Sequence, residues 1–170
     1  MTGRAAILGL GQRGTRWAEV CRMAGWDVAG FDPDDRAGVS LASDKSWRRE
    51  KTISGTVNGM DWVICCLPER LELMRTVIRR AQAAAPDHAM IAVASRAFDI
   101  EAVQGCSIRP AQVFRVTEDE DGGLVLDLNA QNSDELRISV KETFAGFAGV
   151  LSLMPVEDTE EDVTEESRNA

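Results

Sequence analysis

The residues with the clearest chemical meaning lie near the start of the chain, in the stretch Gly9-Leu10-Gly11-Gln12-Arg13-Gly14. Glycines at this spacing have separate uses between a strand and a helix. Gly9 permits a tight turn, Gly11 lets a pyrophosphate approach the backbone, and Gly14 lets the helix pack closely on the strand. The amino end of the helix adds N–H donors for the phosphates. The pattern predicts a phosphate-binding loop, although a glycine-rich turn that serves packing alone would look the same.

A carboxylate at the end of the second apolar run strengthens this interpretation. Asp32 follows Gly14 by 18 residues, where it can accept hydrogen bonds from both ribose hydroxyls and would repel a 2′-phosphate. The loop and Asp32 together predict NAD rather than NADP as the cofactor. Two alternatives stay open: Asp32 can be a plain turn residue before Pro33, and Arg13, within reach of the pyrophosphate, can be an exposed helix residue.

The elements that must position these residues alternate between strands and helices. Apolar runs at 5–8 and 26–31, with a helical pattern at 15–24 between them, predict strand, helix and strand. Five further strands are expected, at residues 62–67, 89–94, 113–116, 124–128 and 150–154. The alternation predicts an α/β fold, a three-layer Rossmann-type doubly wound and mostly parallel sheet.

Two later helices complete this pattern. Pro68 suits the first turn of one helix, and Ser133-Asp134-Glu135 opens another that runs to about Ala148. Their inward-facing positions are expected at Leu71, Met74, Val77, Ile78 and Ala81 in the first, and at Leu136, Val140, Phe144 and Phe147 in the second. The stretch from Arg36 to Asn58 is weakly patterned, with one short strand expected at Thr52-Ile53.

The composition fits one globular domain with a charged tail. The chain has 170 residues, 44% of them hydrophobic and 28% charged, so we expect residues 1–156 to form an NAD-binding domain. From Glu157 onward there are seven acidic residues and one arginine, so residues 157–170 carry −6 of the net charge of −9. This tail is expected to be disordered and to aid solubility.

The same features exclude several classes of partner and location. A body that carries only the remaining −3 argues against nucleic acid and anionic membranes as partners. The sequence has neither an apolar run of about 18 residues nor a signal-peptide pattern, so we expect a cytoplasmic protein. The four cysteines, Cys21, Cys65, Cys66 and Cys106, lack C-x-x-C pairing, which predicts reduced thiols and no metal site.

Three stretches resemble the NAD-binding half of the 3-hydroxyacyl-CoA dehydrogenase family, including its carnitine dehydrogenase and lambda-crystallin relatives. They are AAILGLGQRGTRWAEVCRMAGWDVAGFDPD, MDWVICCLPERLELMRTVIRRAQAAAPDHAMIAVAS and, more weakly, QVFRV with LVLDL. The most specific phrase is Leu67-Pro68-Glu69-Arg70-Leu71-Glu72-Leu73. The resemblance implies an oxidoreductase of fatty acid metabolism. The cofactor-binding residues expected from the loop and the resemblance are Gly9, Leu10, Gly11, Gln12, Arg13, Gly14, Asp32, Pro33, Leu67, Pro68, Glu69 and Ser95.

The chain departs from this family at the catalytic positions. The family uses a histidine base, an acidic partner for it, and a separate helical domain that completes the substrate site and the dimer. His88, the only histidine, precedes a strand and is therefore expected at the wrong edge of the sheet, as a solvated loop residue. Where the family has its base this chain has Arg115-Val116-Thr117-Glu118, while Asp127 falls where the acidic partner would be.

Other positions also depart from the pattern of this family. Glu69 matches a family residue near the nicotinamide, but Met74 stands where a cofactor-contacting lysine is usual, and Arg96 stands near a substrate-contacting serine. Tyrosine is absent, which removes the tyrosine-and-lysine mechanism of short-chain dehydrogenases. Cys65 or Cys66 could be a nucleophile, but a small buried hydrophobe is favoured. The catalytic residues therefore stay unknown.

Three functions are consistent with this sequence. The first is an NAD-binding member of the family that works as a binding or regulatory protein, or as one part of a split assembly. The second is an oxidoreductase acting on a 3-hydroxyacyl-CoA or hydroxy acid, with its site completed by a partner or second copy. The third is an interaction domain that binds no nucleotide. Because the surface that meets the helical domain would be exposed and apolar, we expect at least a weak homodimer.

Overall fold

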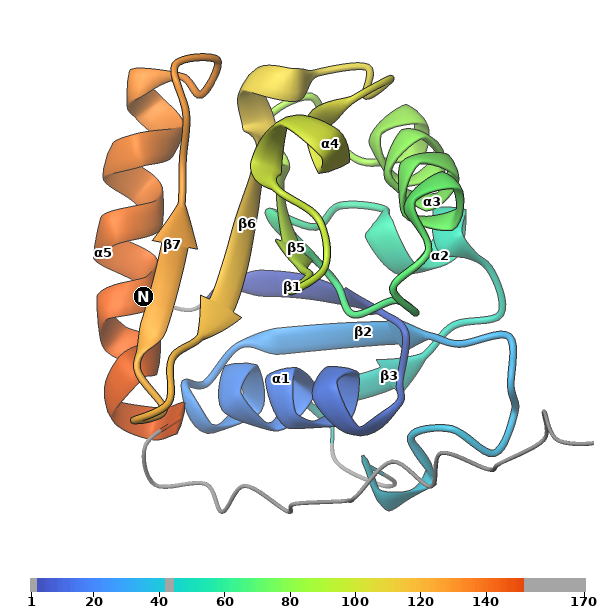
Figure 1. Cartoon of the computed structure of the whole chain (residues 1–170). Coiled ribbons are helices and arrows are strands. Elements are labelled where there is room, and N and C mark those ends of the chain that lie inside the picture. Colours follow the sequence, from blue (N-terminus) through green and yellow to red (C-terminus); the bar gives the residue numbers. More distant parts are fainter. Residues whose placement is uncertain (1–2, 42–44, 152–170) are drawn as a thin grey trace, which may run out of the picture.

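A computed structural model describes residues 3–41 and 45–151 of the chain, which form one seven-stranded sheet with helices on both faces (Figure 1). The strands are β1 (Arg4–Leu8), β2 (Asp27–Phe31), β3 (Trp47–Arg49), β4 (Trp62–Cys65), β5 (Met90–Ala94), β6 (Val113–Glu118) and β7 (Leu124–Asp127). The helices are α1 (Gln12–Met23), α2 (Ile53–Val57), α3 (Leu71–Ala84), α4 (Ile100–Gln104) and α5 (Asp134–Leu151). Two short 3₁₀ helices lie at Val39–Leu41 and Pro110–Gln112.

The strand order β3-β2-β1-β4-β5-β6-β7 is that of a doubly wound sheet. The first six strands are parallel, and β7 pairs antiparallel with β6. The Rossmann-type, mostly parallel fold expected from the sequence is confirmed. No second, helical domain lies within residues 3–41 and 45–151.

The register brings the carboxyl ends of the central strands to one edge of the sheet. Leu8 at the end of β1 pairs with Phe31 of β2 on one side and with Cys65 of β4 on the other. Cys65 in turn pairs with Val93 of β5. The turns that follow these four strands therefore meet at one place, called here the carboxyl edge. The order of strands reverses at this edge between β1 and β4, which is where such folds bind ligands.

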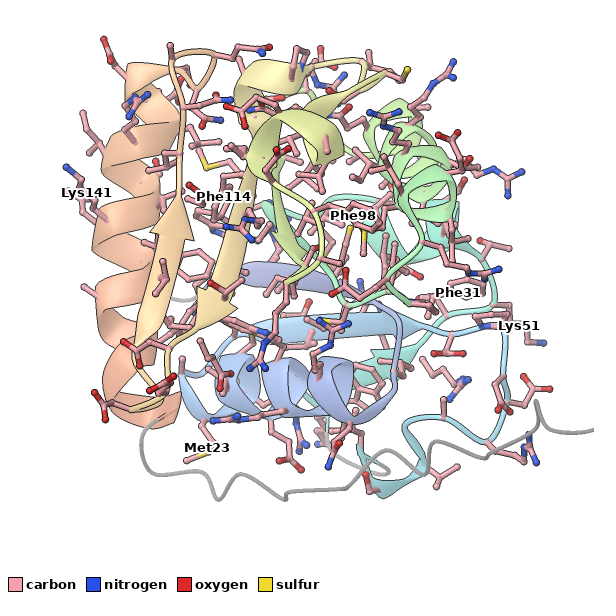
Figure 2. The ribbon with its side chains drawn as sticks, in the orientation of Figure 1. Met23, Phe31, Lys51, Phe98, Phe114 and Lys141 are labelled. Atoms are coloured by element: carbon pink, nitrogen blue, oxygen red, sulfur yellow. The ribbon has the colours of Figure 1, made fainter. Side chains whose placement is uncertain are left out.

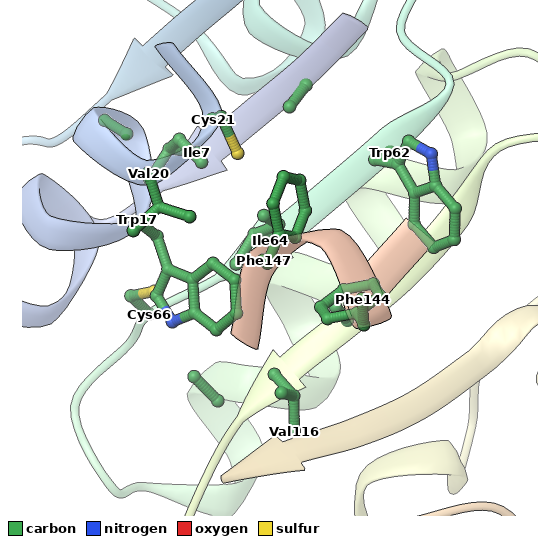
Figure 3. Close-up of a cluster of buried hydrophobic side chains, with 14 of the residues drawn as sticks. Ile7, Trp17, Val20, Cys21, Trp62, Ile64, Cys66, Val116, Phe144 and Phe147 are labelled. Atoms are coloured by element: carbon green, nitrogen blue, oxygen red, sulfur yellow. The ribbon is translucent and has the colours of Figure 1, made fainter. Parts of the chain in front are cut away.

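Two apolar layers hold the sheet in place. One layer packs α1 and α5 against the sheet around Trp17, Trp62 and Phe144, and Figure 3 shows these side chains converging. The other layer packs α2 and α3 on the opposite face around Met74 and Ile78. The side chain of Lys141 on α5 faces outward in Figure 2. Every residue of β4 is buried, as its continuous apolar sequence predicts.

The weakly patterned stretch contains elements that differ from the prediction. The prediction of a short strand at Thr52-Ile53 is wrong. Thr52 is instead the N-cap of α2, and its hydroxyl accepts a hydrogen bond from the Gly55 N–H at 3.0 Å. The actual strand, β3, lies a few residues earlier and pairs with β2 at the edge of the sheet. It is only three residues long, with two exposed arginines, so it carries no alternating pattern.

Several boundaries also differ. Pro68 lies before α3 rather than in its first turn, because the Arg70 N–H turns back to the Pro68 carbonyl at 2.7 Å and the helix begins at Leu71. The strand expected at 150–154 is wrong at its start, since α5 continues through Leu151. Residues 152–154 and the acidic tail at 157–170 lie outside the described residues, so the domain boundary at 156 stays a prediction. No described helix is long and apolar enough to span a bilayer.

Candidate functional site

The glycine loop lies at the carboxyl edge, and its three glycines have different surroundings. A Cβ on Gly9, whose φ is +93°, would lie 2.2 Å from the Cys66 carbonyl oxygen. A Cβ on Gly14 would lie 1.7 Å from the Gly9 carbonyl oxygen. A Cβ on Gly11 would meet nothing within 4 Å. Packing therefore requires the first and third glycines, whereas the space in front of Gly11 is open to a ligand.

The amino end of α1 opens toward this space. Gly11 is the N-cap of α1, and this N-cap makes no side-chain hydrogen bond to the first turn. The first turn of α1 also contains no acidic residue. The Thr15 hydroxyl instead donates to the Leu10 carbonyl at 3.1 Å, which fixes the loop from behind. A helix end of this kind is positively polarised and favours an anion. The local chemistry fits a phosphate or pyrophosphate.

Asp32 joins the glycine loop to the end of β2. One oxygen of its carboxylate, Oδ2, accepts the Leu10 N–H at 2.7 Å, and Oδ1 accepts the Asp34 N–H at 2.8 Å. A carboxylate has about four lone-pair positions, so each oxygen keeps one for a further donor. The partly exposed side chain therefore closes the turn at Pro33 and still has acceptor positions beside the loop. Its binding to a ribose stays a prediction.

Arg13 crosses from α1 to the ends of β4 and β5. Its Nη2 donates to the Leu67 carbonyl at 3.0 Å, and Nη1 donates to the Ala94 carbonyl at 2.9 Å. Nη1 also lies 3.3 Å from Oε1 of Glu69. The side chain therefore points to the second half of the carboxyl edge and not to the space in front of Gly11. Arg13 is an exposed residue of α1, as one of the two expectations had it, and its contact with a pyrophosphate stays a prediction.

Glu69 is itself held by the end of β5. Its Oε2 accepts the Ser95 hydroxyl at 2.7 Å, and its Oε1 accepts the Arg96 N–H at 3.0 Å. Partial burial raises the pKa of Glu69, but these hydrogen bonds and the Arg13 charge outweigh burial, so the pKa lies below its usual value. We call Arg13, Glu69 and Ser95 the Arg13 clasp. It keeps a carboxylate ionised at neutral pH in direct contact with a guanidinium.

Two further ion pairs lie beside the clasp, on β6 and β7. The Arg115 Nη2 and Nε atoms donate to Oδ2 of Asp127 at 2.6 and 2.9 Å, and its Nη1 donates to the Ser95 carbonyl at 3.2 Å. Arg16 of α1 pairs with Glu118 at 2.8 Å, with both side chains less than a fifth exposed. The second half of the carboxyl edge is thus a network of arginines and carboxylates.

Sequence relatives agree with the resemblance. The L-carnitine dehydrogenase/betainyl-CoA thioesterase of Ruegeria pomeroyi is 31% identical over 167 residues, covering 84% of this chain and 34% of that protein. The protein of the same name from a Rhizobium species is 33% identical over 107 residues, covering 52% of this chain and 22% of that protein. The chain spans about a third or less of these curated relatives. No model of a known protein family matches it.

Solved structures give the same result for the fold. The (S)-3-hydroxybutyryl-CoA dehydrogenase of Ralstonia eutropha superposes with a TM-score of 0.77 at 15% identity, covering 87% of this chain and 62% of that one. The 3-hydroxybutyryl-CoA dehydrogenase of Escherichia coli superposes with a TM-score of 0.75 at 16% identity, covering 86% and 37%. The chain matches the amino-terminal domain of the 3-hydroxyacyl-CoA dehydrogenase family.

The resemblance implies a catalytic histidine and its acidic partner at positions that the structure now locates. The strand that would carry the histidine is β6, where Arg115 is ion-paired to Asp127. An arginine stays protonated at any physiological pH and cannot accept a proton from a hydroxyl group. His88 lies before β5, at the opposite edge of the sheet, where its half-exposed ring contacts Asp61 at 3.1 Å. The expected position of His88 as a loop residue away from the carboxyl edge is confirmed.

Two residues at which the sequence departs from the resemblance have clear positions. Met74, where the resemblance implies a lysine, is fully buried between α3 and the sheet, so its side chain is not exposed to a ligand. Arg96 is exposed beside the clasp, and only its N–H takes part in it. Sequence reasoning missed the clasp, because the partners of Arg13 lie more than fifty residues away along the chain.

Three of the four cysteines are buried, which fits a structural role for them. Cys21, Cys65 and Cys66 are buried, and burial raises the pKa of the Cys66 thiol to about 12 and that of the other two still further. Cys106 is exposed. Because a thiolate is the reactive form, buried thiols with raised pKa values are inert. Among the described residues, no group of three or more His, Cys, Asp or Glu side chains is placed to hold a metal ion.

This difference predicts how the thiols react. In the folded protein at pH 8, we expect a chromogenic disulfide reagent to titrate one thiol quickly, and all four cysteines of the sequence after unfolding in guanidinium. Cys106→Ser should remove the fast reaction, whereas Cys21→Ser should leave it unchanged. Fast reaction of Cys65 or Cys66 in the native protein would contradict the buried position and reopen a nucleophilic role.

Proposed function

We propose that this domain binds NAD at the carboxyl edge and works as a binding protein. The observation that carries the proposal is the open space in front of Gly11, at the amino end of α1 and beside Asp32. A diphosphate fits that space, because the helix end supplies N–H donors and the missing side chain gives the phosphates room. The free acceptor positions of Asp32 suit the two hydroxyls of an adenosine ribose, and its negative charge disfavours the 2′-phosphate of NADP.

Several observations favour binding over hydride transfer. Oxidation of an alcohol needs a base, ideally with a pKa near the working pH. Near the carboxyl edge, Asp127 and Glu118 are paired with arginines. The pKa of Glu69 lies below its usual value, which makes it a weak base at neutral pH. We therefore infer that this domain holds the cofactor without performing the reaction by itself.

A second candidate rests on the relatives, which are named as dehydrogenases. A solved neighbour with a TM-score of 0.77 is named as an NAD⁺-dependent dismutase. In this candidate the domain is the cofactor half of an oxidoreductase, and another chain, a second copy or a further part of the protein supplies the base. The homodimer expected from the sequence would supply the second copy that this candidate needs, and light scattering of the concentrated protein tests for it.

Calorimetric titration with NAD, NADH and NADP tests the proposal. We expect NAD to bind at least tenfold more tightly than NADP, because one repulsive charge contact is worth about 1.4 kcal/mol or more. Asp32→Ala should weaken NAD binding by about ten- to a hundredfold, since it removes hydrogen bonds to a charged acceptor. Gly11→Val should abolish binding, because its side chain fills the open space.

Asp35→Ala is the matched control, since this exposed acid lies three residues from Asp32 and should leave NAD affinity unchanged. Circular dichroism and thermal unfolding of each variant separate lost binding from lost structure. If no dinucleotide binds the wild-type protein at millimolar concentration, the proposal is wrong, and an interaction domain that binds no nucleotide becomes the better interpretation.

A further inference from the structure

The second half of the carboxyl edge is the natural place for the second nucleoside of a dinucleotide. A doubly wound sheet has two mononucleotide-binding halves, one on each side of the point where the strand order reverses. Here the glycine loop and Asp32 belong to the half built on β1 and β2. Leu67, in the turn after β4, and Ala94, at the end of β5, belong to the other half. A ligand with its adenosine at Asp32 directs its second nucleoside over those two strand ends.

The guanidinium of Arg13 already covers them. It binds the carbonyl oxygens of Leu67 and Ala94 at 3.0 and 2.9 Å, so one side chain spans both strand ends. The Arg13 side chain is 45% exposed. The guanidinium therefore lies between the two backbone carbonyls and the solvent. A nucleoside ring that approached these carbonyls would have to displace it.

The anchor of Arg13 is rigid. Glu69 faces it at 3.3 Å and is fixed in turn by the Ser95 hydroxyl and the Arg96 N–H. Ser95 is fully buried, so its hydroxyl cannot move away with solvent. Arg13 therefore interacts with two carbonyls and a carboxylate that are all held by neighbouring strand ends. Displacing it would remove the guanidinium donor from the two carbonyls and leave the Glu69 carboxylate with Ser95 and Arg96 alone.

We propose that the Arg13 clasp closes the second half of the site, so that the domain recognises the ADP-ribosyl part of NAD and gains no affinity from the nicotinamide. This inference rests on the proposed function. It narrows the ligand class to adenosine diphosphate ribosyl compounds, whatever group they carry beyond the second phosphate. The oxidised and reduced cofactors would then bind alike, which suits a domain that senses or stores the cofactor without regard to its redox state.

Calorimetric titrations of the wild-type protein with ADP-ribose, NAD and NADH test this inference directly. We expect three dissociation constants within about twofold of one another, since the nicotinamide adds no contact. In Arg13→Met, which keeps a side chain of similar length but no donors, NAD should bind about tenfold more tightly than in the wild type, while ADP-ribose should be unchanged. Glu69→Gln weakens the anchor of Arg13, so it should also raise the affinity for NAD relative to ADP-ribose, but by a smaller factor.

Each outcome has a distinct meaning. The inference would be overturned if the wild-type protein bound NAD more than tenfold more tightly than ADP-ribose. It would also be overturned if Arg13→Met left the ratio of the ADP-ribose and NAD dissociation constants unchanged. Equal weakening of both ligands in Arg13→Met would instead make Arg13 a phosphate contact. Absence of binding by all three ligands would mean that the proposed function itself fails. Arg79→Met, an exposed arginine on α3, is the matched control for loss of positive charge.

Discussion

Gly14→Ala is expected to lower the free energy of unfolding by about 3 kcal/mol, at the upper end of overpacking effects. The new methyl carbon would lie 1.7 Å from the Gly9 carbonyl oxygen, a backbone atom of the turn that cannot rotate away. Relief of the clash requires α1 to move from β1, which also separates the buried side chains between them. Thermal unfolding should show a decrease in Tm of about 10 °C for a domain of this size.

Gly11→Ala is the matched comparison within the same loop. Its methyl carbon meets nothing within 4 Å, and the φ of −67° suits any residue. We expect a loss below about 1 kcal/mol, mainly because alanine is a poor N-cap, together with weaker NAD binding. A Gly14→Ala variant as stable as Gly11→Ala would show that the loop does not adopt this close packing.

The sequence predicts this part of the molecule well, because local patterns determine it. The glycine spacing, the strand before it and Asp32 after the next strand all depend on residues that are near one another in the chain. The central strands were also predictable, since β4, β5 and all of β1 after Arg4 are apolar runs that are almost entirely buried. The amphipathic face of α5 was read correctly through Phe147.

Features that depend on distant residues or on very short elements could not be predicted. The strand β3 has three residues and depends on its pairing with β2. The helix α4 is one turn long and begins at the cap of Asp99, whose carboxylate accepts the Ala102 N–H at 2.8 Å. The sequence does not show which way a long, flexible arginine side chain points, so the Arg13 clasp could be recognised only in the structure. The prediction of a strand at 150–154 fails at its start, because a short apolar run suits either a strand or a helix.

Phe144→Ala is expected to destabilise the domain by about 4 kcal/mol, the usual range for removing a buried phenylalanine. Phe144 is 2% exposed and lies in edge-to-face contact with four aromatic rings. Their centroids lie 5.9, 5.5, 5.6 and 5.5 Å away, in Trp17, Trp62, Phe114 and Phe147. The variant would leave a cavity among them, because rings held by the sheet and α1 cannot collapse into the space. Urea unfolding followed by tryptophan fluorescence measures the loss.

The position of α5 makes this substitution informative about function as well as stability. Phe144 fastens α5 to α1 and the sheet, and α1 carries the glycine loop at its amino end. Ile138→Ala, on the same helix but 59% exposed, should change stability by less than about 0.5 kcal/mol. If both variants lost the same stability, the aromatic cluster would not be the main contact of α5. At a urea concentration where Phe144→Ala stays folded, its NAD affinity should match the wild type. The ring packs on Trp62 at the start of β4 and on Phe114 near the start of β6, away from the carboxyl edge.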